Sequence, residues 1–421
     1  MGEIIKPANW KKNVALFLIG QGLTLFGSML VHYAVMWHIT LETKSGFMMT
    51  LIAIAGALPM LFISPFAGVW ADRYPKKHII NSADAIIAGV TLVMAVLFSL
   101  GYSFTGLLLI CLVARALGQG VQVPAVNALI PELVPTEHLA RVNGFSSGLQ
   151  SLVMFTSPVA GGVLLSIAPI HVLMYIDVIT AAIGISILVF LVKAPTRKQR
   201  EESKAGARQY FLEIGEGLSY VWRQPFLMRF LVLSGLFHIM IAPAAMLTPL
   251  QVARNYGDGI WTVLGSFFIG PEQRLALLEV VYFVGMMMGG LLIGIWGGFK
   301  NKSHTMALST FLLGIGAIGL GLIGNFWLYL ACMGWIGLVM SLFNPAMMAT
   351  LQINVDAAYM GRVFSVLMMM GSLMMPLGMV LWGPLGDEVD ISLLLIGTGV
   401  IMLLMGFVFV LDKVLLQAGE S

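Results

Sequence analysis

The chain of 421 residues is 59% hydrophobic and only 10% charged, with a formal net charge of +3 at pH 7. Because a soluble surface is about a quarter charged or more, this composition excludes a soluble enzyme, a disordered scaffold and a disulfide-stapled secreted domain. The net charge is too small to imply a polyanionic partner, so we expect no binding to nucleic acid.

Apolar stretches fill most of the chain and predict twelve membrane spans, each close to or above the ~20 residues that cross a bilayer. Transmembrane strands are about ten residues long and alternate in polarity, whereas these stretches are longer and do not alternate, so we expect helices. The predicted spans are residues 14–40, 47–71, 79–101, 104–130, 143–168, 171–192, 226–253, 274–299, 305–324, 326–352, 361–384 and 390–412.

Lys and Arg are distributed unevenly among the predicted loops. With a cytoplasmic N-terminus, the inner side holds 19 of the 23 basic residues and the outer side holds 3. Positively charged loops stay on the cytoplasmic side of a membrane. We therefore expect a multi-pass protein of the cell membrane with both termini in the cytoplasm.

One long polar segment divides the spans six and six. Residues 193–225 form a predicted cytoplasmic linker with a surface helix near residues 207–222. We interpret this linker as a charged tether, with a regulatory or lipid-binding element as the alternative. The expected domains are then a six-helix bundle over residues 1–192 and a second over residues 226–421.

The two halves also share sequence. Shifting the chain by 221 residues aligns, among other identities, Pro124 with Pro345 and Arg141 with Arg362. The same shift places the fourth and fifth spans on the tenth and eleventh in the same orientation. We therefore expect parallel repeats that form two pseudo-symmetric bundles.

Arg115 is the most informative polar residue inside a span. It lies about ten residues from the outer start of the fourth span, roughly 15 Å deep and near the middle of the hydrocarbon core. A charge there costs at least about 2.5–3.5 kcal/mol and persists only against a partner or a wet cavity. Gln119 and Gln122 follow on the same helical face. We expect this face to line a cavity, the alternative being a structural pairing of Arg115 with carbonyl groups or a carboxylate.

Other spans carry polar residues at helical spacing, so each set faces one direction. Bonding between neighbouring helices is the alternative explanation for each set. The residues expected to line one central substrate cavity are Gln21, Ser28, His32, Gln119, Gln122, Gln150, His238 and Asn344.

Three acids within the spans can carry a proton in an apolar site. Asp84 lies near the cytoplasmic end of the third span, whereas Asp177 and Glu279 lie near the outer ends of the sixth and eighth spans. The sequence does not choose among the three. We take Arg115, Asp177 and Glu279 as the candidate proton-coupling residues.

Enzyme signatures are missing from the sequence. It contains no HExxH motif, no Walker loop and no paired Asp motif of the kind that holds Mg²⁺ and pyrophosphate. We therefore expect no enzymatic activity, no cofactor and no metal site. Without a nucleotide-binding loop, any pumping has to use an ion gradient.

The segment Gly68-Val-Trp-Ala-Asp72-Arg73-Tyr-Pro-Lys-Lys resembles the G-x-x-x-D-R-x-G-R-[KR] signature of the major facilitator superfamily, with Pro in place of the second Gly. The resemblance implies a cytoplasmic gate that closes in one of two transport states. Asp72 can meet the N-terminus of a helix in the other half, and Arg73 can pair with an acid such as Glu132. The candidate gate residues are Gly68, Asp72, Arg73, Lys76, Lys77, Glu132, Arg141 and Arg362.

Two further segments are similar to the same superfamily. Arg115-Ala-Leu-Gly-Gln119-Gly resembles its R-x-x-Q-G element, shifted by one residue, and in proton-driven members this Arg is tied to proton transfer. Ser157-Pro-Val-Ala-Gly-Gly162 is similar to the G-P-x-x-G-G antiporter signature, with Ser in place of the first Gly. The second resemblance points to efflux.

Over nearly its full length the chain is similar to the macrolide-efflux branch of the drug:proton antiporters. Segments that carry this resemblance are Pro124-Ala-Val-Asn-Ala128, Leu149-Gln-Ser-Leu152 and Gly361-Arg-Val-Phe-Ser365. The resemblance implies an all-α, twelve-helix major facilitator fold. It also implies export of amphipathic, macrolide-like drugs in exchange for protons, by alternating access.

The expected partners are the small-molecule substrate, protons and the lipid bilayer, and the expected state is a monomer. A lipid or metabolite exporter of the same fold remains an alternative. An integral-membrane transferase is the alternative from another class, but it would need convergent acids, His residues or a metal site that we do not find in the sequence.

Overall fold

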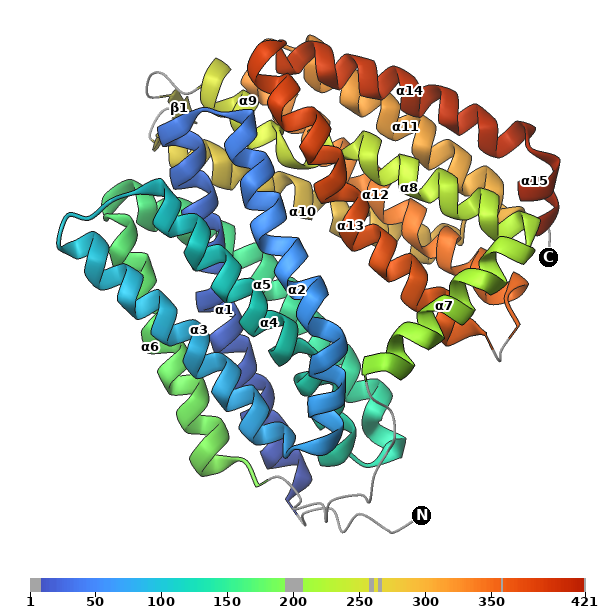
Figure 1. Cartoon of the computed structure of the whole chain (residues 1–421). Helices are drawn as coiled ribbons and strands as arrows, with labels where there is room; N and C mark the ends of the chain where they lie inside the picture. Colours follow the sequence, from blue (N-terminus) through green and yellow to red (C-terminus); the bar gives the residue numbers. More distant parts are fainter. Residues whose placement is uncertain (1–8, 194–206, 257–260, 264–266, 357–358, 420–421) are drawn as a thin grey trace. The chain divides into compact units, whose positions relative to one another are not determined.

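The structure is a computed structural model of the chain (Figure 1), and it describes residues 9–193, 207–256, 261–263, 267–356 and 359–419. The side chains of residues 72, 207–211, 213–214, 261–263 and 267–269 lie outside this description.

Within the described residues, twelve helical segments are long and apolar enough to cross a membrane. Each corresponds to one predicted span, so the prediction of a polytopic helical fold is confirmed. The spanning elements are α1 (Trp10–Thr43), α2 (Gly46–Arg73), α3 (Lys76–Ser99), α4 (Thr105–Leu133), α5 (Leu139–Ile167), α6 (Ile170–Ser186) with η2 (Ile187–Leu191), α8 (Pro225–Met246) with α9 (Thr248–Asn255), α10 (Pro271–Trp296), α11 (Lys302–Leu322), α12 (Phe326–Asn354), α13 (Met360–Glu388) and α14 (Ile391–Leu411).

Short elements join or follow these spans. They are η1 (Thr136–His138), α7 (Ala207–Arg223), β1 (Trp261–Val263), β2 (Phe267–Ile269) and α15 (Lys413–Gly419). The two strands pair antiparallel with Trp261 opposite Ile269. This hairpin departs from the all-helical expectation, and its aromatic and β-branched residues favour strands.

The chain forms two compact units. Unit 1 comprises residues 1–39 and 54–210, and unit 2 comprises residues 40–53 and 211–421. The connection between α1 and α2 therefore belongs to unit 2, together with the first part of α2.

In unit 1, α3 packs against both α4 and α6 (Figure 1), and α1 approaches α6 through glycines. A Cβ atom placed on Gly184 would lie 2.9 Å from the carbonyl oxygen of Gly20. Small residues let two backbones approach closely in a membrane, where packing drives helix association. This close crossing brings the polar side chains of α1 and α6 within reach of each other.

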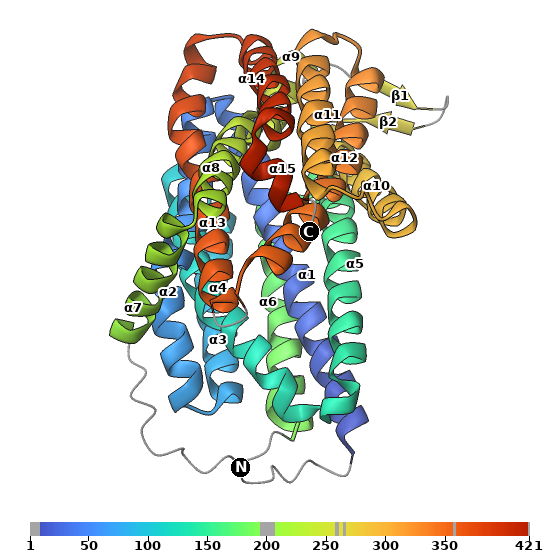
Figure 2. The ribbon, with the colours of Figure 1, turned by 90° about the vertical axis from the view of Figure 1, so that its right-hand side faces the viewer.

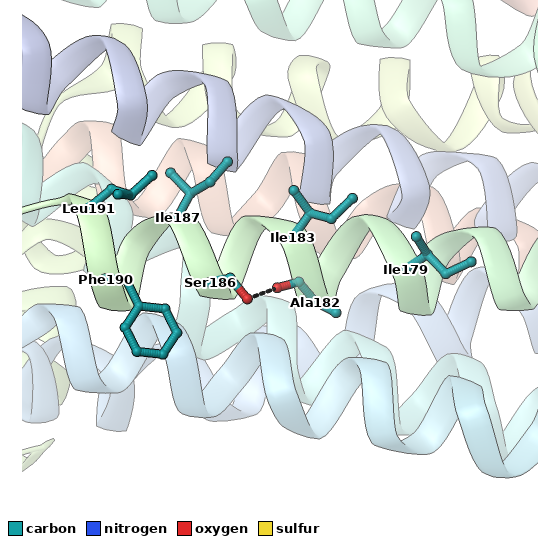
Figure 3. A pocket seen from close by; sticks show the side chains of 7 residues that line it. All are labelled: Ile179, Ala182, Ile183, Ser186, Ile187, Phe190 and Leu191. Atoms are coloured by element: carbon teal, nitrogen blue, oxygen red, sulfur yellow. Dashed lines mark hydrogen bonds between the residues drawn. The ribbon is translucent and has the colours of Figure 1, made fainter.

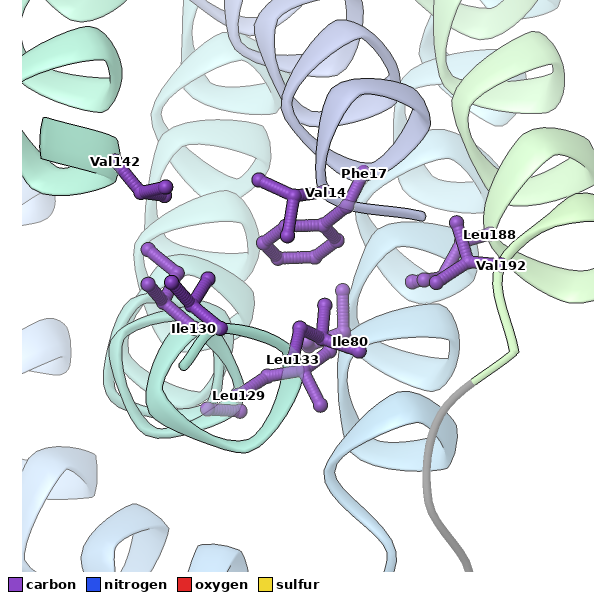
Figure 4. Close-up of a cluster of buried hydrophobic side chains, with 11 residues drawn as sticks. Val14, Phe17, Ile80, Leu129, Ile130, Leu133, Val142, Leu188 and Val192 are labelled. Atoms are coloured by element: carbon purple, nitrogen blue, oxygen red, sulfur yellow. The ribbon is translucent and has the colours of Figure 1, made fainter. Parts of the chain in front are cut away.

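A cluster of buried apolar side chains fills one end of unit 1 (Figure 4), contributed by α1, α3, α4, α5, η2 and the residues that directly follow α4 and η2. Its members are Val14, Phe17, Ile80, Ala125, Leu129, Ile130, Leu133, Val134, Val142, Leu188 and Val192. On α3, the first buried carboxyl group, that of Asp84, comes one helical turn beyond Ile80. The apolar cluster therefore borders the polar residues of unit 1.

In unit 2, α11 packs against α12 and α14, α12 packs on α10, and α8 packs on α13 and α14 (Figures 1 and 2). Glycines bring α10 and α12 into close contact. A Cβ atom on Gly285 or Gly289 would overlap the carbonyl oxygens of Gly334 and Leu338, respectively. This crossing requires the two glycines because backbone atoms occupy the space that a side chain would need.

The helix bounds carry the internal repeat that the sequence predicts. α4 and α12 each have 29 residues and begin at Thr105 and Phe326, which are 221 positions apart. α5 and α13 also have 29 residues each and begin at Leu139 and Met360, again 221 positions apart. The sequence shift therefore reproduces where these helices start and end.

Some helix ends differ from the predicted spans for local reasons. The predicted eighth span, residues 274–299, corresponds to α10, which ends at Trp296. The following Gly297 has φ of 73°, a left-handed conformation that glycine adopts readily and that ends a helix. The start of α12 is fixed by Asn325, whose side chain accepts hydrogen bonds from the N–H groups of Trp327 and Leu328.

Candidate functional site

Arg115 of α4 is the centre of a buried polar cluster in unit 1. It is 3% exposed, and its Nη1 donates a hydrogen bond to Oδ2 of Asp177 on α6 at 2.5 Å. The guanidinium also donates to the hydroxyl of Thr91 on α3 and, at 3.2 Å, to the backbone carbonyl of Ser28 on α1. Four helices therefore meet at this guanidinium.

The ion pair makes two buried charges tolerable. Asp177 is 1% exposed, and removing a carboxylate from water costs several kcal/mol even after relaxation. The guanidinium balances that charge, and Thr91 and Ser28 accept hydrogen bonds from its other N–H groups. The sequence allows two explanations for Arg115: it lines a cavity, or it pairs structurally with carbonyl groups or a carboxylate. The structure shows the pairing with a carboxylate.

A glycine provides the space for this carboxylate. A Cβ atom on Gly27 of α1 would lie 2.8 Å from Oδ1 of Asp177 and would overlap the hydroxyl of Thr180. Thr180 in turn donates a hydrogen bond to the backbone carbonyl of Asp177 at 2.9 Å. A larger side chain at position 27 would therefore push Asp177 out of its place.

A second polar cluster lies further along the same helices. Nε2 of Gln122 on α4 donates to Oδ1 of Asp84 on α3 at 2.7 Å and to Oε1 of Gln21 on α1 at 3.4 Å. Asp84 is 1% exposed, and the two glutamines are half-buried. This cluster thus joins one carboxyl group to two amides.

Both clusters contain a hydrogen bond between α3 and α4, and the two bonds lie one after the other along these helices. Thr91 follows Asp84 by seven residues on α3, and Gln122 follows Arg115 by seven residues on α4. Seven residues are two helical turns, or about 10 Å. Because consecutive spans run antiparallel, this equal spacing places Thr91 opposite Arg115. In the same way it places Asp84 opposite Gln122.

Other predicted cavity residues of unit 1 lie apart from these hydrogen bonds. His32 of α1 and Gln119 of α4 are half-buried, and His32 is within electrostatic range of Arg115. Gln150 of α5 is exposed and donates to Ser146 on its own helix at 3.5 Å. The predicted set is therefore only partly assembled into the two clusters.

Three predicted site residues belong to unit 2. Glu279 of α10 is half-buried, and Asn344 of α12 is exposed. Nδ1 of His238 on α8 lies 2.7 Å from the backbone carbonyl oxygen of Ser234, to which it donates as N–H. Among the hydrogen bonds described within unit 2, none joins these three residues to one another.

The predicted gate residues at the α2–α3 connection tie α3 to its neighbours. Lys76 donates to Glu132 at 2.7 Å and so joins the start of α3 to the end of α4. Lys77 donates to two backbone carbonyls at the end of the α6–η2 helix, at 2.9 Å each. The sequence predicts a pairing of Arg73 with Glu132, but Lys76 contacts Glu132 and Arg73 is exposed at the end of α2. Asp72 lies in α2, but its side chain falls outside the description.

The remaining gate candidates lie on α2, α5 and α13. Gly68 is exposed on α2, and the guanidinium of Arg141 lies 5.8 Å from the ring centroid of Phe145 on α5. Arg362 of α13 pairs with Glu216 of α7 at 3.2 Å. Arg362, which the internal repeat aligns with Arg141, therefore contacts α7, the helix at the end of the linker.

Tyr220 also attaches α7 to the α12–α13 connection. Its ring stacks on that of Tyr359 with centroids 4.3 Å apart, and its hydroxyl donates to Asp356 at 3.0 Å. Burial raises the pKa of Tyr220 above its usual 10.0, and the charge of Asp356 adds to the increase. The phenol is therefore kept neutral, as its role as a donor requires.

A depression of about 510 Å³ lies on the face of α6 and η2 (Figure 3). It is lined by Ile179, Ala182, Ile183, Ser186, Ile187, Phe190 and Leu191. Phe190 is 80% exposed, and the hydroxyl of Ser186 bonds to the carbonyl of Ala182 on its own helix. The lining is apolar and includes none of the predicted site residues.

Two members of the polar clusters are absent from the predicted site. Thr91 gave no signal by itself, because a threonine in an apolar helix commonly bonds to its own backbone. The sequence identifies Asp84 as an acid inside a span but does not indicate its partner. The signal that could have found both is the seven-residue spacing that Asp84 and Thr91 share with Arg115 and Gln122.

The sequence of the chain matches one family model and several known proteins. A family model described as Major Facilitator Superfamily matches residues 14–271. Macrolide efflux protein A of Streptococcus pyogenes is 28% identical over 400 residues, which cover 94% of this chain and 95% of that protein. The protein of the same name from Enterococcus faecalis is 29% identical over 330 residues, covering 78% of this chain and 98% of that protein.

Solved structures support the fold assignment. A crystal structure of a peptide transporter POT aligns with a TM-score of 0.73 at 12% sequence identity, covering 97% of this chain and 96% of that chain. Similarity at this identity concerns the fold alone. The relatives named above confirm the resemblance to the macrolide-efflux type that the sequence predicted.

Proposed function

Since the chain belongs to the major facilitator superfamily, we propose that it exports amphipathic, macrolide-like drugs in exchange for protons. Membership makes the chain a multi-pass membrane transporter. The observation that carries the choice of cargo is the similarity to macrolide efflux protein A, which extends over 94% of the chain.

Proton coupling is proposed to depend on the Arg115–Asp177 pair. Both partners are buried, so a proton bound or released near this ion pair changes the net charge of a site with a low dielectric constant. A conformational change follows when the two states differ in how well they accommodate that charge. Glu279 is the proposed proton-coupling acid of unit 2.

Transport is proposed to proceed by alternating access, in which two six-helix halves expose a central site to each side in turn. The proposed orientation has both termini in the cytoplasm of the cell, and the segment Gly68 to Lys77 acts as the cytoplasmic gate. The proposed cavity is lined by Gln21, Ser28, His32, Gln119, Gln122, Gln150, His238 and Asn344.

The test is uptake of radiolabelled erythromycin by liposomes that contain the purified protein, with a pH gradient as the sole driving force. An acidic lumen is expected to drive accumulation, because each proton that leaves exchanges for drug that enters. A protonophore is expected to abolish it. Protein-mediated uptake that ignores the gradient would overturn proton exchange.

The same vesicles separate the alternative functions. A labelled phospholipid or a small polar metabolite carried in preference to erythromycin would replace drug export by lipid or metabolite export. A chemically altered product, detected by chromatography of the vesicle contents, would indicate a transferase. Protein-free liposomes provide the background for each measurement.

A further inference from the structure

Asp84 is a buried carboxyl group that the proposed coupling pair does not include. It lies on α3 eight residues after Lys76, about 12 Å along the helix. Its side chain is 1% exposed. Oδ1 accepts a hydrogen bond from Gln122 at 2.7 Å, whereas Oδ2 is buried and has no hydrogen-bond partner among the described residues.

Asp84 and Asp177 are equally buried but differ in their partners. Asp177 contacts the guanidinium of Arg115, which neutralises its charge. The hydrogen bond described for Asp84 comes from a neutral amide. An amide stabilises a carboxylate far less than a cation does, so the two carboxyl groups have different preferred states.

The charges that face Asp84 do not compensate an ionised carboxylate. From α1 and α4 the facing groups are the amides of Gln21 and Gln122, and from α6 Asp177 acts on Asp84 electrostatically. Arg115 precedes Gln122 by two turns of α4 and is already bound to Asp177. Ionised Asp84 would thus add an uncompensated negative charge to a buried site that holds another carboxylate.

We propose that Asp84 is the proton-binding carboxyl group of unit 1 and that the Arg115–Asp177 pair remains ionised while Asp84 gains and loses the proton. This assignment rests on the proposed proton-coupled function. On binding, an O–H bond forms at the unpartnered Oδ2 and a hydronium ion becomes water. On release, the O–H bond breaks and the proton passes to water. Asp84 is then a carboxylate that still accepts the hydrogen bond from Gln122.

The geometry also connects this event to two neighbouring helices. Gln122 donates to both Asp84 on α3 and Gln21 on α1. When Asp84 loses its proton, its demand on the shared Nε2 increases, because hydrogen bonds to charged acceptors are stronger. The protonation state of Asp84 on α3 can therefore change the strength of the hydrogen bond between Gln122 on α4 and Gln21 on α1.

The first test is infrared difference spectroscopy of the purified protein between acidic and alkaline pH, which needs no cargo. The wild type is expected to show the carbonyl stretch of a protonated carboxylic acid, and Asp84→Asn is expected to remove one component of it. Asn81→Ala, which removes a half-buried amide on the same helix, is expected to keep that component. A spectrum unchanged by Asp84→Asn would overturn the proposal.

The second test uses radiolabelled erythromycin in proteoliposomes. Asp84→Asn is expected to lose gradient-driven accumulation and to retain exchange of labelled for unlabelled drug without a gradient, which also shows that the variant is folded. Accumulation at the wild-type level would overturn the assignment of Asp84. If the wild type itself ignores the pH gradient, the proposed function fails, and the infrared result still decides whether Asp84 binds a proton. Accumulation that follows a sodium gradient instead would replace the proton by Na⁺.

Discussion

Nη1 of Arg115 lies 2.5 Å from Oδ2 of Asp177, so an ion pair joins α4 to α6 across 62 residues of sequence. The exposed fractions of the two side chains are 3% and 1%. The pair explains how a guanidinium persists inside an apolar helical unit, because each ion balances the charge of the other. The proposed link between drug movement and proton movement depends on this balance.

Arg115→Ala is expected to destabilise unit 1 and to abolish gradient-driven export. The substitution leaves the Asp177 carboxylate buried without a counter-ion, which costs about 3–5 kcal/mol. The double variant Arg115→Ala/Asp177→Asn removes both charges, so it is expected to regain most of the stability but not the export. Thermal unfolding in detergent and erythromycin uptake into liposomes measure the two effects.

The matched control for Arg115 is the ion pair of Arg229 with Asp412, which has a similar distance of 2.7 Å. The side chain of Arg229 is 50% exposed, and exposed pairs contribute about 0.2–1 kcal/mol. Arg229→Ala is therefore expected to be mildly destabilising and to keep export. A stable and exporting Arg115→Ala protein would contradict the role given to the buried pair.

Two adjacent glycines of α10 give a sharp packing test. A Cβ atom on Gly289 would overlap the carbonyl oxygen of Leu338 and the hydroxyl of Ser341, whereas one on Gly290 would meet nothing within 4 Å. Gly289→Ala is expected to cost about 1–3 kcal/mol through overpacking. Gly290→Ala is expected to be neutral or to stabilise by about 0.5–1 kcal/mol, because alanine favours helices. Equal effects on the unfolding temperature would show that α10 and α12 do not cross here.

Asp387 near the end of α13 caps the start of α2 within unit 2. It accepts hydrogen bonds from the N–H groups of Gly46 at 2.6 Å and Phe47 at 2.9 Å, from the hydroxyl of Ser45 at 2.9 Å, and from Arg254 at 2.6 Å. Asp387→Ala removes all four and is expected to cost about 1–3 kcal/mol. Thermal unfolding of the purified variant measures this loss.

Asp390 provides the comparison for Asp387. It caps α14 through the N–H group of Ser392 at 2.9 Å, the hydrogen bond described for its side chain. Asp390→Ala is expected to destabilise less than Asp387→Ala, because fewer donors lose their acceptor. The opposite order would refute the cap on α2.

The attachment of α7 is expected to weaken at alkaline pH. Burial and the charge of Asp356 raise the pKa of Tyr220 in the folded state above its usual 10.0. The stabilisation is then fully present below pH 10.0 and is lost as the pH rises through the folded-state pKa, because the ionised phenol repels Asp356 instead of donating to it.

A spin label at the exposed position Leu212, in a variant with Cys111 and Cys332 replaced by Ala, measures the mobility of α7. Mobility is expected to increase above about pH 10 in the parent and to be independent of pH in Tyr220→Phe. The same alkaline transition in Tyr220→Phe would exclude Tyr220 as the titrating group.

The spans could be predicted from the sequence because a bilayer imposes a minimum length and an apolar surface on every helix that crosses it. The predicted fourth span, residues 104–130, corresponds to α4 at Thr105–Leu133. The ends differ by a few residues because they depend on local caps rather than on hydropathy.

The partners of the polar residues could not be predicted in this way. Helical spacing placed Arg115 and Gln122 on one face, but it did not say which neighbouring helix covers that face. The packing of α3 against both α4 and α6 determines which helices cover that face. It brings Asp177 to Arg115 and brings Asp84, which the sequence could not distinguish from other acids, to Gln122.

The central claim is tested most directly by the pH inside proteoliposomes while a macrolide enters. Vesicles containing the purified protein and a trapped pH indicator receive erythromycin outside, with equal pH on both sides at the start. Exchange predicts that the lumen becomes more alkaline than in protein-free vesicles as the drug enters, and that Asp84→Asn removes this difference. Protein-mediated entry of erythromycin with no additional change in lumenal pH would contradict it.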